Sequence, residues 1–391
     1  MVFVYFYQKV CDYMFYDKQS RKQQEEYKNM LAIIGKLTLL FSESDSPYLP
    51  YRCHENIFCK YFDAENLGRK DCSADAKKED YGIGLKTWVG NDDQKVAEFG
   101  KLKPKYDMLN GLPLCKKISE YRNERIRITM NMYGIKNMLY HIVKRISGEM
   151  QIFEHAFDYI DIDNIVLLEE RGNDNNTYFT DGKHTYHFSK SKNTLYMIFD
   201  DLKLMDSFNV EILADPYDYL LQLNSSISSM SITSDGKLEH DLKNQLCLRL
   251  YTIIHGRKIV SPKSGLNQWN AGGRRRNENE IYIPYPVVDR NRNSDFFPPR
   301  DTPFDLRMPD GTIISSKVCQ DGGKAIMSNP NKALGEWLLR KVFELKPGVV
   351  LTYEDLEKYN IDSVVFTKHN DGTYSIDFAE LGTYESFYEK E

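Results

Sequence analysis

The sequence has few cysteines and no long apolar run, and each absence excludes a class of protein. Its 7 cysteines are scattered singly over 391 residues, without a CxxC pair, which disfavours a disulfide framework and a structural zinc site. The longest apolar stretch, near residues 30–41, is interrupted by Gly35 and Lys36 and is too short and polar to span a bilayer. The N-terminal segment lacks the basic region and small-residue cleavage site of a secretory signal. We therefore expect a cytoplasmic protein without a membrane partner.

An excess of positive charge is also missing. The chain has 52 basic and 57 acidic residues, a formal net charge of -5, so it does not coat nucleic acid by bulk charge. Residues 257–307 are the exception, because 10 basic and 6 acidic side chains give this window a local charge of +4. Any polyanion is therefore expected to bind a local patch.

Two classes of enzyme are disfavoured because the sequence lacks their motifs. The Walker signature is absent, so NTP-driven translocation is not supported. None of the 8 histidines has a lysine two positions later, and the phospholipase-D type of nuclease needs that pair. Metal-free phosphodiester chemistry of this kind is excluded.

A change in composition divides the chain. Residues 222–241 are rich in serine and poor in large aromatic side chains, which is typical of a linker or a long surface loop. We predict a first domain at residues 1–225, a linker at 226–242 and a second domain at 243–391. The alternative is an internal loop of one large domain.

The first part of the chain mixes helical and strand patterns. Its expected elements are a helix at 25–41, strands at 73–78 and 83–89, helices at 91–101 and 116–145, and a meander at 176–188 and 193–199 with a hairpin turn at Asp181–Gly182. Two strands followed by a helix indicate an α+β arrangement.

The second part is richer in strands. Strands are expected at 246–254, 280–284, 304–307, 313–319 and 363–368, with a helix that opens at Asn329–Pro330. Several short strands with one or two helices predict a small open barrel.

Carboxylates and a lysine gather in residues 71–101. Metal-assisted phosphodiester hydrolysis needs carboxylates that hold a divalent cation and a positive charge near the attacking water. A hairpin can place Asp75 on its first strand beside Lys86 on its second. The position two residues before the lysine, where the usual motif has an acid, is Gly84. We expect Glu98, on the helix predicted to follow, to supply the second carboxylate.

This order of residues resembles the PD-(D/E)XK nuclease core, in the form of restriction endonucleases whose second carboxylate has moved to the next helix. The resemblance implies an N-terminal α/β nuclease domain that uses Mg²⁺, in which Lys86 orients or deprotonates the attacking water. The catalytic residues implied are Asp75, Lys86 and Glu98, with Glu55 on the preceding helix as an auxiliary acid. The metal ligands implied are Asp75, Glu98 and the main-chain carbonyl of Leu85. Asp71 and Asp80 are rivals of Asp75 as the first carboxylate.

Polar and basic side chains also gather in two segments of the second part. Residues 264–277 surround Trp269 with asparagine, glutamine and arginine in a glycine-containing loop, and residues 324–332 bring lysine, serine and asparagine before a helix. Arginine pairs with guanine, and asparagine or glutamine with adenine, in the major groove. Two such loops on one face would hold a duplex between them.

The stretches SGLNQWNAGG, EIYIPYP and KVCQDGGKAIMSNPNKALGEWLLR resemble the DNA-recognition domain of restriction endonucleases of the NgoFVII, NgoAVII, BfiI and EcoRII type. That domain is a β-rich pseudobarrel shared with plant B3 transcription factors, and the likeness covers roughly residues 243–378. It implies that residues 264–277 form an N-arm and residues 324–332 a C-arm, which grip the major groove. The contact residues implied are Ser264, Asn267, Trp269, Asn270, Arg274, Arg275, Arg276, Lys324, Ser328, Asn329, Asn331 and Lys332. Trp269 can instead be a packing anchor, and we expect one or two of the three arginines to reach bases while the others touch phosphate.

Together these resemblances imply a type II restriction endonuclease that makes sequence-specific double-strand cuts in DNA by Mg²⁺-dependent hydrolysis. Its partners would be double-stranded DNA and a cognate DNA methyltransferase, and the sequence is compatible with a monomer or a homodimer. The alternative is a sequence-specific DNA-binding regulator with an inactive N-terminal domain, which the missing acid at Gly84 favours. A nuclease without sequence preference is a third, weaker reading.

Overall fold

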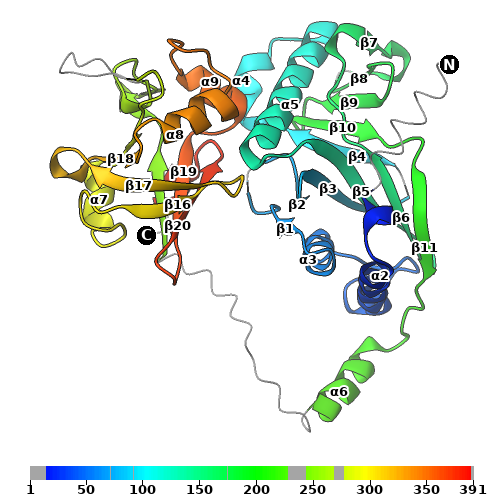
Figure 1. Ribbon diagram of the computed structural model, residues 1–391. Coiled ribbons are helices and arrows are strands. Elements are labelled where there is room, and N and C mark those ends of the chain that lie inside the picture. Colours follow the sequence, from blue (N-terminus) through cyan, green and yellow to red (C-terminus); the bar gives the residue numbers. More distant parts are fainter. Residues whose placement is uncertain are drawn as a thin grey trace. The chain divides into compact units, whose positions relative to one another are not determined.

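The computed structural model describes residues 15–70, 72–90, 92–173, 175–227, 244–267 and 277–388 (Figure 1). The chain divides into two compact units, residues 1–123 with 135–238, and residues 124–134 with 239–391. The boundary after Leu238 falls between the two domains expected from composition, and helix α6 (Pro216–Ile227) precedes it. No helix in the described part of the chain is both long and apolar enough to cross a membrane.

The first unit contains a six-stranded sheet in the order β1-β2-β3-β5-β6-β11. β3 and β5 run parallel, and the other neighbouring strands run antiparallel. The predicted hairpin is confirmed as β2 and β3. A parallel pair needs a crossover connection, and the helix α5 (Gly111–Tyr133) lies within it. The strands are β1 (Glu65–Asn66), β2 (Ala76–Lys78), β3 (Tyr81–Val89), β5 (Asn137–Ile146), β6 (Glu149–Ala156) and β11 (Lys203–Asn209).

Helices α2 (Arg21–Lys36) and α3 (Tyr51–Tyr61) cover one face of this sheet (Figure 1). Leu31 of α2 and Phe58 of α3 lie in one buried cluster with Leu85 of β3. Side chains alternate between the two faces along a strand, so Gly84 and Lys86 point to the opposite face. The shorter helical segments of this unit are η1 (Tyr16–Lys18), η2 (Thr38–Leu40), η3 (Gly100–Leu102), α4 (Lys103–Tyr106), η4 (Ile162–Asn164) and η5 (Glu169–Arg171).

A second sheet in this unit has five antiparallel strands in the order β4-β10-β9-β8-β7. The predicted meander is confirmed, and its hairpin turn contains Asp181 and Gly182. The Asp181 carboxylate accepts the main-chain N–H groups of Lys183 and His184, which fixes the turn. The strands are β4 (Asp93–Glu98), β7 (Val166–Leu167), β8 (Asn176–Thr180), β9 (Thr185–Ser189) and β10 (Thr194–Ile198).

Two predicted helices are wrong in whole or in part. The segment expected to be helical at 91–101 contains the strand β4, whose pairing with β10 outweighs a weak helical pattern. The helix expected at 116–145 ends at Tyr133. Gly134 then adopts a φ of 65°, a left-handed conformation that commonly ends helices, and β5 follows.

The second unit is built on a seven-stranded, barrel-like sheet in the order β12-β19-β20-β16-β17-β18-β15, in which β16 and β20 run parallel. The strands predicted at 313–319 and 363–368 are confirmed. Its strands are β12 (Gln245–Arg249), β15 (Ile283–Pro284), β16 (Phe304–Arg307), β17 (Ile313–Cys319), β18 (Ala325–Ser328), β19 (Ser363–Lys368) and β20 (Tyr374–Ala379), beside a small hairpin of β13 (Thr252–Ile254) and β14 (Arg257–Ile259).

The helix expected to open at Asn329–Pro330 begins later, as α8 (Ala333–Gly335), and continues as the wider π-helical turn η9 (Glu336–Val342). The other helical segments of the second unit are η7 (Gly265–Asn267), α7 (Val287–Arg292), η8 (Asp321–Gly323), α9 (Tyr353–Tyr359) and α10 (Thr383–Tyr388).

Candidate functional site

Asp75 lies directly before β2 and is held against the edge of β3. Its main-chain N–H donates to the carbonyl of Ile83 at 2.9 Å, and its carboxylate Oδ2 accepts the N–H of Leu85 at 2.7 Å. The N–H and C=O of one strand residue point to the same side of the strand. The Leu85 carbonyl therefore faces the same edge of β3 as the Asp75 carboxylate.

Glu55 reaches this edge from helix α3. Its side chain is buried and accepts a hydrogen bond from Nη1 of Arg52 at 2.8 Å. A Cβ atom on Gly68 would lie 2.5 Å from the Glu55 carboxylate, so the loop before β2 packs directly on this acid. The charges of Asp75 and Lys86 both shift the pKa of Glu55, which shows that the three groups are electrostatic neighbours.

Burial dominates the ionisation of all three groups. It raises the pKa of Asp75 and of Glu55, and it lowers the pKa of Lys86. The ammonium and the two carboxylates then oppose each other's shifts, because each stabilises the charged form of the other. A cluster of one buried and two half-buried groups with such shifts is characteristic of functional sites.

The structure places Glu98 on a different element from the one predicted. Glu98 lies on strand β4 rather than on a helix, is exposed, and its carboxylate lies 3.1 Å from Nζ of Lys95. An acid in place of Gly84 is also ruled out sterically, since a Cβ there would lie 2.8 Å from the Tyr140 ring. Tyr140 stacks on Phe157 with ring centroids 4.1 Å apart, so it is not free to move aside.

The two rivals of Asp75 differ in their positions. Asp80 lies in the turn of the β2–β3 hairpin, with Nζ of Lys136 3.7 Å from its carboxylate. Asp71 lies outside the described residues. Of the candidates that the structure describes, Asp75 is therefore the acid next to Lys86.

Asn267 holds the N-terminal end of the N-arm against the rest of the domain. Its Nδ2 donates to the carbonyls of Ser261 at 3.2 Å and Leu351 at 2.9 Å, while its Oδ1 accepts the Leu351 N–H at 2.8 Å. The predicted base contact of Asn267 is therefore corrected to a brace within the protein. Ser264 is half-buried, and its Oγ has no hydrogen-bond partner among the described residues. The remaining predicted N-arm contacts lie outside the described residues, namely Trp269, Asn270, Arg274, Arg275 and Arg276.

The two residues that follow the N-arm, Glu278 and Asn279, dock on the helix that follows the C-arm. Arg340 donates from Nε to Oδ1 of Asn279 and from Nη2 to the carbonyl of Glu278, each at 2.7 Å. A Cβ on Gly335 would lie 1.9 Å from the carbonyl oxygen of Asn279. Only glycine allows this close approach, so the local sequence selects the docking geometry.

The C-arm exposes most of its predicted contacts but not Ser328. Lys324, Asn329, Asn331 and Lys332 are exposed, and Lys332 lies 3.2 Å from the carboxylate of Glu336. Ser328 is fully buried. Its Oγ donates to the Pro330 carbonyl and accepts the Leu334 N–H, both at 2.9 Å. Ser328 therefore shapes the arm from inside, and its predicted contact with DNA is wrong.

Residues 241–370 match the NgoFVII C-terminal B3-like DNA-binding domain. The match includes both arms and leaves residues 1–240 outside it. No curated protein matches the chain. The B3-like domain implies DNA as a partner of this chain and sequence-specific recognition as the task of this domain.

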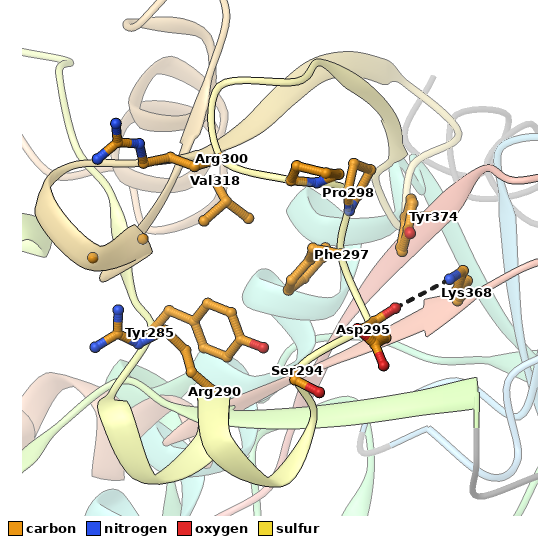
Figure 2. Close-up of a pocket in the computed structure, with 13 residues that line it drawn as sticks. Tyr285, Arg290, Ser294, Asp295, Phe297, Pro298, Arg300, Val318, Lys368 and Tyr374 are labelled. Carbon is orange, nitrogen blue, oxygen red and sulfur yellow. Dashed lines mark hydrogen bonds between the residues drawn. The ribbon is translucent and has the colours of Figure 1, made fainter.

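A pocket of about 720 Å³ opens in the B3-like domain next to the C-arm (Figure 2). Gly322 and Gly323, which directly precede Lys324 of the C-arm, line it together with Arg290 and Lys368. Lys368 Nζ donates to the carbonyl of Asp295 at 3.4 Å, and Nε of Arg290 is buried without a hydrogen-bond partner among the described residues. Arg300 adds a third cation to the lining (Figure 2).

These cations suit a phosphate of the DNA backbone. The sequence reasoning missed them as individual residues, although Arg290 and Arg300 lie within the basic window 257–307. Arg340 was also missed, because its partners Asn279 and Glu278 are distant in sequence. Arg52 was missed because its contact with Glu55 lies within one helical turn that matches no motif.

Proposed function

We propose that the chain is a Mg²⁺-dependent type II restriction endonuclease, in which the B3-like domain reads the DNA sequence and the first unit hydrolyses the phosphodiester bond. The proposal rests above all on one observation, the grouping of Asp75, Lys86 and Glu55 at the β2–β3 hairpin. The hairpin is followed by the crossover helix α5 and the parallel strand β5. This arrangement supports the PD-(D/E)XK resemblance of the sequence.

The donor set fits a magnesium ion. Asp75, Glu55 and the carbonyl of Leu85 offer oxygen atoms only, and Mg²⁺ prefers such hard ligands. Burial raises the pKa of both carboxyl groups, because it disfavours their charged forms, and a bound cation would stabilise those charged forms. In this proposal Glu55 takes the part that the sequence assigned to Glu98. Bound Mg²⁺ would stabilise charge on the phosphoryl oxygens and lower the pKa of the attacking water.

Lys86 positions or deprotonates the attacking water. Its Nζ lies 6.0 Å from the centre of the Tyr140 ring, on the face of β3 opposite to α2 and α3. Burial lowers the pKa of this lysine, which brings a lysine closer to use as a base. In-line attack then leaves a 5′-phosphate and a 3′-hydroxyl.

The arms supply sequence discrimination. The exposed side chains of Asn329 and Asn331 can pair with base edges, and Lys324 can contact phosphate or guanine. Each good base contact contributes about 1–3 kcal/mol of discrimination. A few such contacts in the B3-like domain can therefore supply the sequence specificity, and the nuclease unit needs only to bind the DNA backbone.

The decisive experiment compares Lys86→Ala with the wild-type chain on plasmid DNA and Mg²⁺. Wild type should give discrete bands, whereas Lys86→Ala should lose cleavage and keep a sequence-specific mobility shift. Lys22→Ala, on an exposed face of α2, is the matched control and should cut normally. Retained cleavage by Lys86→Ala would remove Lys86 from the site.

A second candidate function is a sequence-specific DNA-binding regulator with an inactive first unit. Two observations favour it, the filled space beside Gly84 and the position of Glu98 in the other sheet. A wild-type chain that shifts a specific duplex but never cuts with Mg²⁺ would support the regulator, and a smear would indicate a nuclease without sequence preference. A restriction endonuclease would also have a cognate DNA methyltransferase as its partner. Sedimentation of the purified chain would distinguish a monomer from a homodimer.

A further inference from the structure

Two histidines and an aspartate from separate elements of the first unit bring potential metal ligands together. His155 lies on β6, His184 lies in the turn before β9, and Asp200 follows β10. Each offers one ligand atom, and the three atoms lie within 4.8 Å of one another. The ring centroids of the two histidines are 5.0 Å apart. Because β6 belongs to the six-stranded sheet and β9 and β10 to the five-stranded sheet, the cluster lies where these two sheets meet.

The hydrogen bonding of the two rings leaves nitrogen lone pairs for a ligand. Nδ1 of His155 lies 2.9 Å from the carbonyl of Ala156. A carbonyl only accepts, so Nδ1 carries the proton and Nε2 carries the lone pair. Nε2 of His184 is buried and lies 3.5 Å from the carboxylate of Asp158. Metal-binding histidines are commonly oriented by such a carbonyl or carboxylate on the far nitrogen.

The packing around His155 also holds its ring in place. The ring of Phe199 packs edge-on against His155 with centroids 5.2 Å apart, which restricts its rotation.

We propose that His155, His184 and Asp200 bind one zinc-type dication, which clasps the two sheets of the first unit together. Two imidazoles and one carboxylate suit Zn²⁺ far better than Mg²⁺ or Ca²⁺, which prefer oxygen ligands alone. Water can complete a tetrahedron. The clasp is separate from the oxygen-only site at Asp75, and it stands whether or not the chain is a nuclease.

The test uses the full-length chain after removal of metals with a chelator. Zn²⁺ titrated into the protein should bind at one equivalent and raise the melting temperature, and excess Mg²⁺ should not compete. Co²⁺ in the same site should produce the visible absorption bands of a tetrahedral nitrogen and oxygen environment, a readout that does not depend on activity.

His184→Ala and Asp200→Asn should each weaken Zn²⁺ binding at least about tenfold, the lower bound seen for changes even in outer-shell partners. His255→Asn, at an exposed histidine of the second unit, is the control and should bind as wild type does. Asp200 is exposed, so Asp200→Asn keeps the test valid if His184→Ala fails to fold. Absence of stoichiometric Zn²⁺ binding by wild type, or unchanged affinity in Asp200→Asn, would overturn the clasp.

Discussion

Arg340 and Asn279 join the chain that follows the N-arm to the helix that follows the C-arm. The guanidinium bonds the Asn279 side chain through Nε and the Glu278 carbonyl through Nη2, and its Nη1 donates to the carbonyl of Leu345 at 2.8 Å. Arg340 belongs to η9, which follows the C-arm, and Asn279 lies two residues after the end of the N-arm. Because the donors of a guanidinium form a rigid fork, these bonds fix the distance between the end of the N-arm and the helix that follows the C-arm.

We expect Arg340→Lys to weaken specific DNA binding about tenfold or more, which corresponds to about 1.4 kcal/mol. A lysine keeps the charge but cannot make the three directed bonds. Mobility shifts on a duplex that contains the cleavage site measure the effect. Arg307→Lys, at an exposed arginine of β16, should bind normally. Equal affinity of Arg340→Lys and wild type would mean that the arms are positioned independently.

The two candidate second carboxylates can be separated by mutation. Glu55→Gln should reduce the rate of Mg²⁺-dependent cleavage at least about a hundredfold, because loss of one group that stabilises charge in an active site commonly lowers the rate by that factor. Glu98→Gln should leave cleavage unchanged, since Glu98 is exposed on the other sheet. Initial rates of plasmid cutting measure both.

The reverse result, loss of activity in Glu98→Gln with Glu55→Gln active, would restore the metal-ligand set first expected from the sequence. Circular dichroism of each variant checks that the substitution has not unfolded the first unit, because Glu55 is buried and bonded to Arg52.

Gly84 should not accept the acid that the usual motif has at this position. A side chain there collides with Tyr140, so Gly84→Glu is expected to destabilise the chain by at least about 1–3 kcal/mol and to gain no activity. Urea unfolding measures the change in the free energy of unfolding. Gly100→Ala is the control, since a Cβ at Gly100 meets open space. A stable and more active Gly84→Glu would show that Tyr140 moves aside.

The sequence predicted individual strands and the hairpin well, but it predicted poorly which distant segments pair with each other. The strands at 313–319 and 363–368 and the β2–β3 hairpin were found because alternation and turn residues are local signals. Glu98 was misplaced because residues 91–101 carry little periodicity of their own, and their strand form depends on β10, which lies about a hundred residues later in the chain.

The candidate sites show the same division between residue type and environment. Asn267 has the right chemistry to read a base, but its amide is used by Leu351, and no local spacing signals that contact. His155 and His184 are too far apart in sequence for a spacing motif, and only the packing of two sheets brings them together.

Stability should fall in acid partly because His141 is buried without charge. Its Nε2 lies 3.0 Å from the Tyr27 hydroxyl, its side chain is 0% exposed, and burial lowers its pKa from 6.5 to about 3. Below pH 6.5 the unfolded chain therefore binds a proton that the folded chain does not. The free energy of unfolding falls as pH drops from 6.5 towards 3, at up to about 1.4 kcal/mol per pH unit.

Glu154, next to His141, acts in the opposite direction over a pH range that overlaps the lower one between pH 4.5 and 6.5. Burial raises its pKa from 4.5 to about 8, so the folded chain keeps a proton that the unfolded chain loses, and stability declines as pH rises from 4.5 to 8. Between pH 4.5 and 6.5 the two groups offset each other in wild type, so the stability of His141→Asn should rise relative to wild type as pH falls below 6.5, while the slope between pH 6.5 and 8 stays in place. Urea unfolding at each pH unit from 4 to 8 measures both slopes, with His255→Asn as the control. An unchanged slope below pH 6.5 in His141→Asn would mean that the folded protein takes up the proton at His141 as readily as the unfolded chain does.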